Sequence, residues 1–357
     1  MPAIRVLVVE DSLTIRKYLC EVLASAPDMV VVGEAEDGKR AIELCAELRP
    51  DVVTMDMMLP VMTGLSATEF IMAYCPTPIL IVSSSTNRGE LFKTYDALAA
   101  GAVDVLDKPS GDEPNTAWES QFISRVRLVS RIRIITHPRA RLAGYDRKHV
   151  ENVTHPPVIG SNGKRACHVV GIGASTGGPG AIAQILRSLP PDFQIPILLV
   201  LHMGEPFGSS FADWLDSQSS RPVSCAKDGM MVTSMLGQVV LAPPNWHMIV
   251  RGGRVRLTQD PERHSCRPSV DVLFESLAAE YGSGVATCLL TGMGRDGASG
   301  TLAVHRAGGL TFAQDEASSV VYGMPREAVL LNAVDHVLPI TEIAPALARL
   351  VTRYDGG

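Results

Sequence analysis

Aromatic residues, paired cysteines and long apolar segments are all scarce in this chain of 357 residues. Its seven cysteines form no C-x-x-C pair, which argues for free thiols in a reducing compartment and against structural zinc. The net charge of -6 gives no overall basic surface, so we expect no nucleic-acid partner. No apolar run approaches the roughly 20 residues of a membrane helix, and the first residues lack the apolar core of a signal peptide. We therefore expect a soluble, cytoplasmic protein without direct membrane insertion.

The hydropathy pattern divides the chain into two α/β domains, each expected to be a doubly wound parallel sheet. In the first domain we expect strands at residues 4–9, 30–32, 51–55, 79–82 and 103–106, and a final helix over residues 118–135. In the second domain we expect strands near residues 168–172, 195–201 and 286–291, interrupted by a β-rich insertion over residues 239–257 with a hairpin around Gly252-Gly253. The pattern predicts domains at residues 1–136 and 166–357, joined by a Pro- and Gly-containing linker at residues 137–165.

Polar residues follow four of the expected strands in the first domain. Glu10 and Asp11 follow the first strand and Asp56 follows the third, and a set of carboxylates suits Mg²⁺. Ser83 and Lys108 follow the fourth and fifth strands and supply a hydroxyl and a cation. Each residue alone could be a helix cap or a solvated surface group, but the set in this order predicts phosphoryl transfer to a carboxylate.

With these residues, the first domain resembles the flavodoxin-like receivers of the response-regulator family. The resemblance implies that Asp56 accepts a phosphoryl group from a sensor histidine kinase. It also implies a Mg²⁺ site formed by Glu10, Asp11, Asp56 and the backbone carbonyl of Met58. Ser83 and Lys108 would form the switch that responds to phosphorylation. Met58 and Thr63 stand at positions that are often acidic in related receivers, and this departure bears on kinase choice and dephosphorylation rate.

A glycine turn follows the first expected strand of the second domain. Residues 173–177, GASTG, match the G-x-S-x-G pattern, which exposes a serine hydroxyl at a strand-to-helix turn. Pro179 stands where a phosphate-binding loop needs lysine, and Thr176 stands where a dinucleotide fingerprint needs its third glycine. Ser175 is therefore the candidate nucleophile, with His202 as base and Asp296 as orienting acid, because all three follow expected strands.

Structural alternatives exist for each member of this set. A lone histidine is usually an ordinary polar residue, and Asp296 could simply cap a helix. The histidines at positions 168, 247, 264 and 305 lack the placement of His202 at a strand end. Jointly, the three positions favour a serine hydrolase. The order Ser, His, Asp disfavours the α/β-hydrolase fold, in which the acid precedes the histidine.

Four further strings accompany these residues: His202-Met203, Ser210-Phe211-Ala212, Leu241-Ala242-Pro243-Pro244 and Arg267-Pro268-Ser269-Val270-Asp271. With them, the second half resembles the Rossmann-like catalytic domain, with its β-hairpin, of the chemotaxis protein-glutamate methylesterase family, whose receiver the first half matches. The resemblance implies that Ser175 attacks methylated glutamates on chemoreceptor helices and that methanol leaves. It also implies that glutamine side chains are deamidated there, and that the esterase step needs no cofactor. It implies oxyanion support near Thr176 and Met293. Gly204-Glu205 replaces prolines that are usual in the family.

Regulation and two rival functions complete the expectations. The resemblance implies that the unphosphorylated receiver packs over the catalytic cleft and that phosphorylation loosens this packing. One rival is a phosphorylation-controlled receptor-binding module without catalysis, against which the intact Ser175, His202 and Asp296 argue. The other is a receiver fused to a nucleotide-binding domain, which the failed phosphate-loop patterns disfavour.

Overall fold

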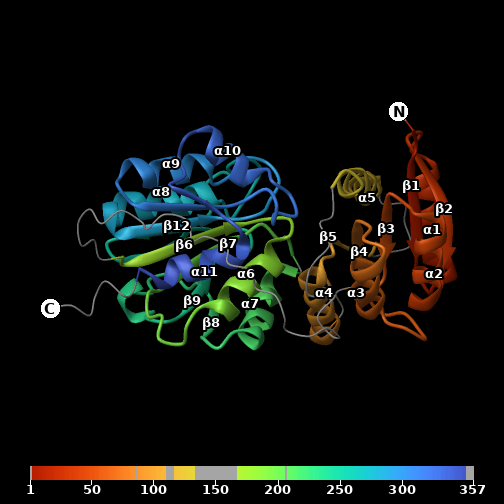
Figure 1. Cartoon of the computed structure of the whole chain (residues 1–357), viewed down its shortest axis with the longest axis horizontal. Helices are drawn as coiled ribbons and strands as arrows, with labels where there is room; N and C mark the ends of the chain where they lie inside the picture. Colours follow the sequence, from red (N-terminus) through yellow and green to blue (C-terminus); the bar gives the residue numbers. More distant parts are fainter. Residues whose placement is uncertain (1, 85–86, 110–115, 133–166, 206, 351–357) are drawn as a thin grey trace, which may run out of the picture.

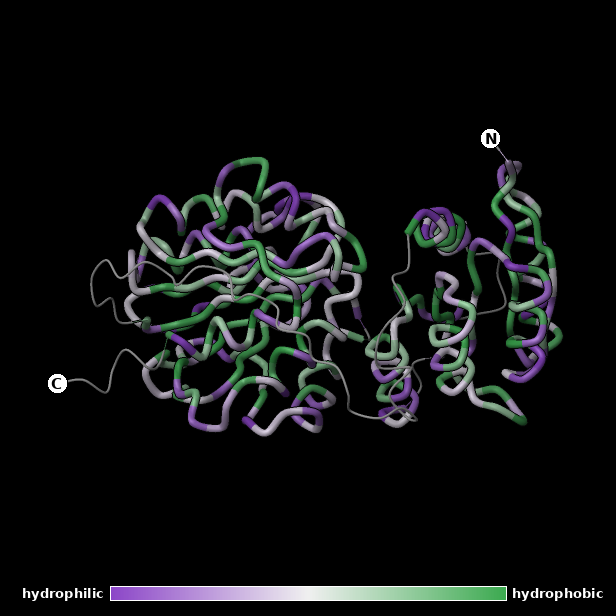
Figure 2. Tube along the Cα trace, in the orientation of Figure 1, coloured by the Kyte–Doolittle hydropathy of each residue, from purple (hydrophilic) through white to green (hydrophobic). Residues whose placement is uncertain are grey.

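The computed structural model describes residues 2–84, 87–109, 116–132, 167–205 and 207–350, which form two α/β units (Figure 1). The expected linker at residues 137–165 lies outside the described residues. None of the described helices is both long and apolar enough to cross a membrane. In Figure 2 the strands at the centre of each unit are mainly hydrophobic, and hydrophilic residues gather toward the outer turns.

The first unit is a five-stranded parallel sheet, as the sequence predicts, and its strands lie in the order β2-β1-β3-β4-β5. Its elements are β1 (Ile4–Val9), α1 (Leu13–Ala24), β2 (Met29–Ala35), α2 (Gly38–Leu48), β3 (Val52–Met55), α3 (Gly64–Tyr74), β4 (Ile79–Ser83), α4 (Arg88–Ala100), β5 (Asp104–Asp107) and α5 (Thr116–Val129). Residues on alternate sides of the strands pack into two apolar clusters, one under α1 and α5 and the other under α2, α3 and α4.

Two features set the lengths of the helices in this unit. Asp37, Thr63 and Asn87 each accept a hydrogen bond from a backbone amide three residues later, which fixes the first turns of α2, α3 and α4 close to the strand ends. The last helix is shorter than expected, because α5 ends at Val129 and the Ile132 amide bonds back only three residues to the Val129 carbonyl. The remainder of the expected helix, residues 133–135, lies outside the described residues.

The second unit is a seven-stranded parallel sheet in the order β14-β13-β12-β6-β7-β9-β8, with a separate antiparallel hairpin β10-β11. Its elements are β6 (Val169–Ala174), α6 (Gly178–Ser188), β7 (Ile197–Leu201), α7 (Phe207–Gln218), β8 (Val223–Cys225), β9 (Val239–Leu241), β10 (His247–Arg251), β11 (Arg254–Thr258), α8 (Val270–Tyr281), β12 (Val285–Leu289), α9 (Ala298–Arg306), β13 (Leu310–Gln314), α10 (Met324–Leu330), β14 (His336–Leu338) and α11 (Ile340–Ala348), with 3₁₀ turns at Val232–Ser234 and Gly282–Gly284.

Two expectations for the second unit are wrong in detail. β9 pairs with β7 and β8 inside the main sheet, so the expected β-rich insertion reduces to the β10-β11 hairpin. β12 ends at Leu289, before Thr291, because the Thr291 amide bonds the side chain of Gln314 and no longer continues the ladder. The chain starts this sheet at β6, moves outward to β8, and returns to β12 on the other side of β6. β6 and β12 therefore flank the point where the strand order reverses, which is where open α/β sheets bind ligands.

The two units meet where α4 packs against α6 and α7 (Figure 1). The Tyr95 ring lies 5.5 Å from those of both Phe211 and Trp214, and its hydroxyl donates a hydrogen bond to the backbone carbonyl of Phe207. Trp214 Nε1 donates to Asp96 Oδ1 at 2.9 Å. A buried aromatic cluster with two direct hydrogen bonds thus joins the receiver-like unit to the start of α7.

The rest of this contact combines a close approach of two helix backbones with an exposed ion pair. A Cβ atom at Gly180 of α6 would lie 3.4 Å from the Ala99 Cα atom, so the C-terminal end of α4 approaches the backbone of α6 directly. An ion pair of 3.1 Å joins Arg88 to Asp213 at the edge of the contact, where both side chains are mostly exposed. Exposed pairs contribute little, about 0–1 kcal/mol, so the aromatic cluster dominates the interface.

Candidate active site

Ser175 lies directly beyond β6 on a turn that the neighbouring loops hold in place. Its backbone amide donates to the Thr291 carbonyl at 3.0 Å, and its carbonyl accepts from the Gly178 amide at 2.7 Å. Gly177 has a φ of +78°, and a Cβ atom there would lie 2.5 Å from the Val320 side chain. The G-x-S-x-G pattern therefore forms the strand-to-helix turn that the sequence predicts.

His202 and Asp296 form a hydrogen-bonded pair beside this turn. His202 follows β7, and its amide continues the ladder to the Ala174 carbonyl at 3.0 Å, which places it next to Ser175 at the same edge of the sheet. Its Nε2 lies 2.8 Å from Asp296 Oδ2. Since a carboxylate accepts from Nε2, that nitrogen carries the proton and Nδ1 offers its lone pair. In the described part of the chain, no hydrogen bond joins the Ser175 hydroxyl to His202. Such bonds often tighten only with substrate bound.

Asp296 is buried and receives hydrogen bonds from the start of α8. Oδ1 accepts from the Ser269 hydroxyl at 2.7 Å and from the amides of Asp271 and Gly297, while Oδ2 accepts from the Val270 amide at 2.7 Å. Burial raises the pKa of Asp296, but the His202 contact and these donors outweigh it and lower the pKa below its usual value. Asp296 is therefore a fixed, ionised partner for His202.

The imidazole of His202 is correspondingly basic. Burial lowers its pKa, but hydrogen bonds to Asp296 and Cys266 and the charges on these residues raise the pKa to about 9. Cys266 Sγ lies 3.7 Å from His202 Nδ1, and within 4.8 Å of an Asp296 carboxylate oxygen. The pair thus combines a proton held toward the acid with a basic nitrogen on the other side of the ring.

Two backbone amides beside Ser175 are free to bind an anion. In the described residues, neither the Thr176 amide nor the Met293 amide donates a hydrogen bond. Met293 follows Gly292, where a Cβ atom would lie 2.8 Å from Ser175 Cβ and 2.3 Å from Met324 Sδ. Only glycine at position 292 lets this loop approach the serine, so the candidate oxyanion donors from two loops come together at one place.

A second polar site lies at the matching edge of the first sheet, between β1 and β3. Lys108 Nζ lies 2.8 Å from Glu10 Oε2 and 3.1 Å from Asp56 Oδ2, and both carboxylates are almost fully buried. Oxygen atoms of Glu10, Asp11 and Asp56 lie within 4.8 Å of one another. The Ser83 side chain is buried at the end of β4, and its carbonyl accepts from the Lys108 amide at 3.1 Å. The expected residues of the first site therefore gather at one point.

The charges of this cluster fit a divalent cation. Burial and the charge of Asp56 raise the pKa of Glu10 to about 7 against the opposing effect of Lys108. Asp56 Oδ1 is buried and has no hydrogen-bond partner in the described residues. A buried carboxylate oxygen without a partner is costly, and an oxygen-only donor set with excess negative charge is the kind that holds Mg²⁺.

Comparison with known proteins places both units. The receiver-domain model of response regulators matches residues 6–115, and the CheB methylesterase model matches residues 170–347. A protein-glutamate methylesterase/protein-glutamine glutaminase of Nitrosospira multiformis is 42% identical over 98% of this chain and 97% of its own length. The chain belongs to the CheB methylesterase family.

Other members of this family give the same result. A protein-glutamate methylesterase/protein-glutamine glutaminase of Anaeromyxobacter dehalogenans is 41% identical over 97% of each chain. The Thermotoga maritima CheB methylesterase catalytic domain, known from a crystal structure, is 36% identical in sequence and matches with a TM-score of 0.49. The match covers 52% of this chain and 99% of the Thermotoga chain. The two full-length alignments with the relatives from Nitrosospira multiformis and Anaeromyxobacter dehalogenans extend the family relationship over the receiver and the catalytic domain together.

Sequence reasoning missed two residues that contact the candidate active site. The sequence identifies Ser269 only as a member of the string at residues 267–271, although its hydroxyl both caps α8 and donates a hydrogen bond to Asp296. A serine directly before a helical pattern was the available signal, since such residues cap helices. Cys266, three residues earlier, carried no signal of its own, because only the folded loop brings it to His202.

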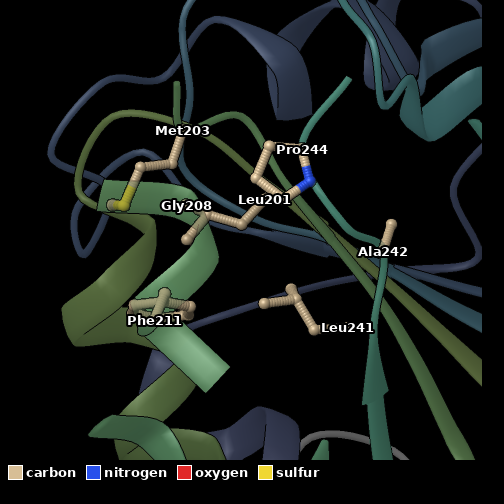
Figure 3. Close-up of a pocket in the computed structure, with 7 residues that line it drawn as sticks. All are labelled: Leu201, Met203, Gly208, Phe211, Leu241, Ala242 and Pro244. Carbon is tan, nitrogen blue, oxygen red and sulfur yellow. The ribbon is translucent and has the colours of Figure 1, made fainter. Parts of the chain in front are cut away.

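A small pocket lined by apolar residues lies against α7, beyond the end of β7 (Figure 3). It is lined by Leu201, Met203, Gly208, Phe211, Leu241, Ala242 and Pro244. Met203 directly follows His202, and Phe211 packs against Tyr95 of the receiver. The pocket contains none of the proposed catalytic residues. Its position means that a movement of α7 at the receiver contact would repack side chains next to His202.

Proposed function

We propose that this chain is a phosphorylation-activated protein-glutamate methylesterase that hydrolyses glutamate γ-methyl esters on the cytoplasmic helices of chemoreceptors and also deamidates glutamines there. The observation that carries the proposal is the group of Ser175, His202 and Asp296 at three neighbouring strand ends, with the His202–Asp296 hydrogen bond of 2.8 Å. A nucleophile, a base and a buried acid in this order perform acyl transfer without a cofactor.

In the first half of the reaction, Ser175 Oγ attacks the γ-carbonyl carbon of the methylated glutamate. His202 Nδ1 accepts the hydroxyl proton, and the fixed charge of Asp296 stabilises the imidazolium that results. The unpaired amides of Thr176 and Met293 stabilise the negative charge on the carbonyl oxygen. When the C–O bond to the methoxy group breaks, His202 returns the proton and methanol leaves.

In the second half, water attacks the acyl-enzyme. His202 takes a proton from the water molecule, the bond to Ser175 Oγ breaks, and the proton passes to the serine. The product is the free glutamate side chain. With glutamine in place of the methyl ester, the same steps release ammonia, which accounts for a deamidase activity of the same site.

The receiver supplies the control. Asp56 accepts the phosphoryl group from a sensor histidine kinase, and Glu10, Asp11, Asp56 and the Met58 backbone carbonyl would hold Mg²⁺, which when bound offsets the charge of the transferred group. The partnerless Asp56 Oδ1 and the raised pKa of Glu10, caused by burial and by the charge of Asp56, support this assignment. Ser83 and Lys108 then respond to the phosphorylated state. We place the chain in the cytoplasm, where kinase and receptor helices meet it.

The contact between the two units supports inhibition by the unphosphorylated receiver. α6 begins three residues after Ser175, and α7 begins five residues after His202. α4 packs against both helices through the cluster around Tyr95. Phosphorylation that shifts α4 would therefore act on the two helices that follow the nucleophile and the base, and would open access for the receptor.

Methanol release from methyl-labelled receptor membranes tests the proposal. Wild-type chain and Ser175→Ala are compared with and without a small-molecule phosphodonor and Mg²⁺. We expect release from the wild type that rises with the phosphodonor, and no release from the serine variant in either state. Absence of release from the wild type, with retained binding to receptor membranes, would instead identify a phosphorylation-controlled binding module.

A further inference from the structure

A cysteine faces the catalytic histidine from a turn that the proposed reaction does not use. Residues 263–266 form a tight turn in which the amide and carbonyl groups of Arg263 and Cys266 bond each other at 3.2 and 2.9 Å. The turn holds Cys266 Sγ 3.7 Å from His202 Nδ1. One ligand atom each from His202, Cys266 and Asp296 lie within 4.8 Å of one another. The active site therefore contains a mixed nitrogen, sulfur and oxygen donor set.

The spacing of the nitrogen and sulfur atoms suits zinc. Zinc bound tetrahedrally by one imidazole nitrogen and one thiolate, with bond lengths of about 2.0 and 2.3 Å, separates these two atoms by about 3.5 Å. The observed 3.7 Å is close to this separation before any movement of the side chains. Hard cations such as Mg²⁺ prefer oxygen ligands, so the donor set selects a thiophilic ion.

His202 already makes the second contact that is common in zinc sites. Histidines that bind zinc commonly donate the second ring N–H to a carboxylate, which fixes the ring and raises the basicity of the ligating nitrogen. Here Nε2 bonds Asp296 Oδ2 at 2.8 Å, and Nδ1 lies 3.7 Å from the sulfur. The arrangement that makes Nδ1 a good proton acceptor also makes it a good metal ligand.

We propose that His202 and Cys266 bind Zn²⁺ reversibly, with Asp296 as the supporting carboxylate, and that bound zinc switches the esterase off. Binding displaces the thiol proton of Cys266 and, below about pH 9, the Nδ1 proton of His202 into solvent. Zinc then engages the Nδ1 lone pair, which can no longer accept the proton of Ser175. Water fills the remaining coordination positions. Two strong protein ligands are fewer than the four of structural zinc sites, so the ion is exchangeable. The inhibitory part rests on the proposed role of His202 as the base.

Zinc inhibition of methanol release by the full chain is the first test. Buffered ZnCl₂ is titrated into wild type, Cys266→Ser and the control Cys225→Ser, and each rate is divided by the rate of the same variant with EDTA. Cys225 is a half-buried thiol on β8, away from His202. We expect EDTA-reversible inhibition of wild type and Cys225→Ser, and a half-inhibitory zinc concentration raised roughly tenfold or more in Cys266→Ser. Equal inhibition of all three proteins would overturn the proposal.

His264 offers a matched test of the ligand assignment. It belongs to the same turn, and its Nε2 lies 3.1 Å from Asp271 Oδ2. His264, Asp271 and Asp296 form a second cluster of possible metal ligands. We expect His264→Ala to retain zinc inhibition. Inhibition that disappears in His264→Ala but persists in Cys266→Ser would move the metal away from His202 and overturn the proposal.

Cobalt binding gives a readout that does not need turnover. Co²⁺ added to the full chain is expected to give a thiolate-to-metal absorption band that zinc displaces and that Cys266→Ser lacks. Because the band is independent of catalysis, it tests the metal site even if the proposed esterase function fails. A band of equal intensity in Cys266→Ser, or no band in the wild type, would overturn the site. A Cys266-dependent band without inhibition would overturn the proposed block of His202.

Discussion

At the scale of single residues, the candidate active site is organised around one buried carboxylate. Asp296 accepts from His202, from the Ser269 hydroxyl and from backbone amides at the start of α8 and α9. Hydrogen bonds to a charged group are worth about 1.5–3 kcal/mol each, and their removal leaves a buried charge unsatisfied. The carboxylate therefore cannot rotate away from His202 without losing several partners, and the ring orientation of His202 is fixed by a network, not by a single contact.

The basicity of His202 predicts the pH dependence of turnover. The imidazole must be neutral to accept the serine proton, and its pKa is raised to about 9 because the contacts with Asp296 and Cys266 outweigh burial. We therefore expect kcat/KM for methanol release to rise with pH and to level off only near pH 9. A profile already level at pH 7 would contradict a raised pKa of His202. Measurement at constant ionic strength, with unfolding monitored at each pH, separates titration from denaturation.

Gly292 provides a second test at this scale. A Cβ atom at this position would lie 2.8 Å from Ser175 Cβ and 3.1 Å from the Ser175 amide nitrogen. Gly292→Ala should therefore displace the nucleophile and lower kcat by roughly 100-fold, the usual cost of a misplacement of about 1 Å.

The control for this variant is Gly204→Ala, which lies in the loop after His202. A Cβ atom at Gly204 meets nothing within 4 Å. We expect this variant to keep a rate close to that of the wild type. Equal activity of the two alanine variants, with both folded by circular dichroism, would contradict the tight contact between the two loops.

At the scale of secondary-structure elements, the sequence predicts local features better than contacts between loops. The five strands of the receiver and the β10-β11 hairpin are confirmed, because β-branched runs and the Gly252-Gly253 turn are local signals. β9 was wrongly assigned to an insertion, since a three-residue strand gives no information on its neighbours. The role of Ser269 and the place of Cys266 depend on contacts with residues 27 and 64 positions away. Such contacts leave no periodic trace in the sequence.

The α4–α7 contact leads to a prediction about basal activity. Tyr95→Phe removes the hydroxyl that bonds the Phe207 carbonyl and keeps the ring that packs on Phe211 and Trp214. Loss of one hydrogen bond of about 1 kcal/mol should raise methanol release without phosphodonor by roughly fivefold, if the contact holds the inhibited state. The phosphorylated rate should change little.

Tyr74→Phe is the matched control for this variant. Tyr74 ends α3 in the same domain and is 72% exposed. It should leave both rates unchanged. An unaltered basal rate in Tyr95→Phe would show that this hydrogen bond does not restrain the catalytic domain.

At the scale of the whole molecule, two parallel sheets place one chemical site each at the point where their strand order reverses. In the receiver this point lies between β1 and β3, and in the catalytic domain it lies between β6 and β12. The two sites share no residue, so information passes through the helices between them. α4 of the receiver contacts both α6 and α7. The sequence predicts both sites, but not the helix that connects them.

Asp56→Asn tests this connection in the full chain. The amide keeps the size of the side chain but cannot accept a phosphoryl group, so we expect the low rate seen without phosphodonor to persist and stimulation to vanish. The matched comparison is Asp51→Asn, since Asp51 directly precedes β3 and its side chain accepts from the Arg5 amide away from the cluster. Full stimulation of Asp56→Asn would contradict control through this carboxylate.

The hydrogen bond from Tyr95 ends on a main-chain carbonyl, and this has a consequence for how the interface can change over evolution. Every amino acid at position 207 presents the same acceptor, provided that α7 still begins there. The side chain at 207, buried in the core of the catalytic domain, is therefore free to follow packing requirements alone. The receiver side has no such freedom, because only tyrosine at position 95 combines the ring with the hydroxyl. Substitutions should accumulate unequally on the two sides of one contact.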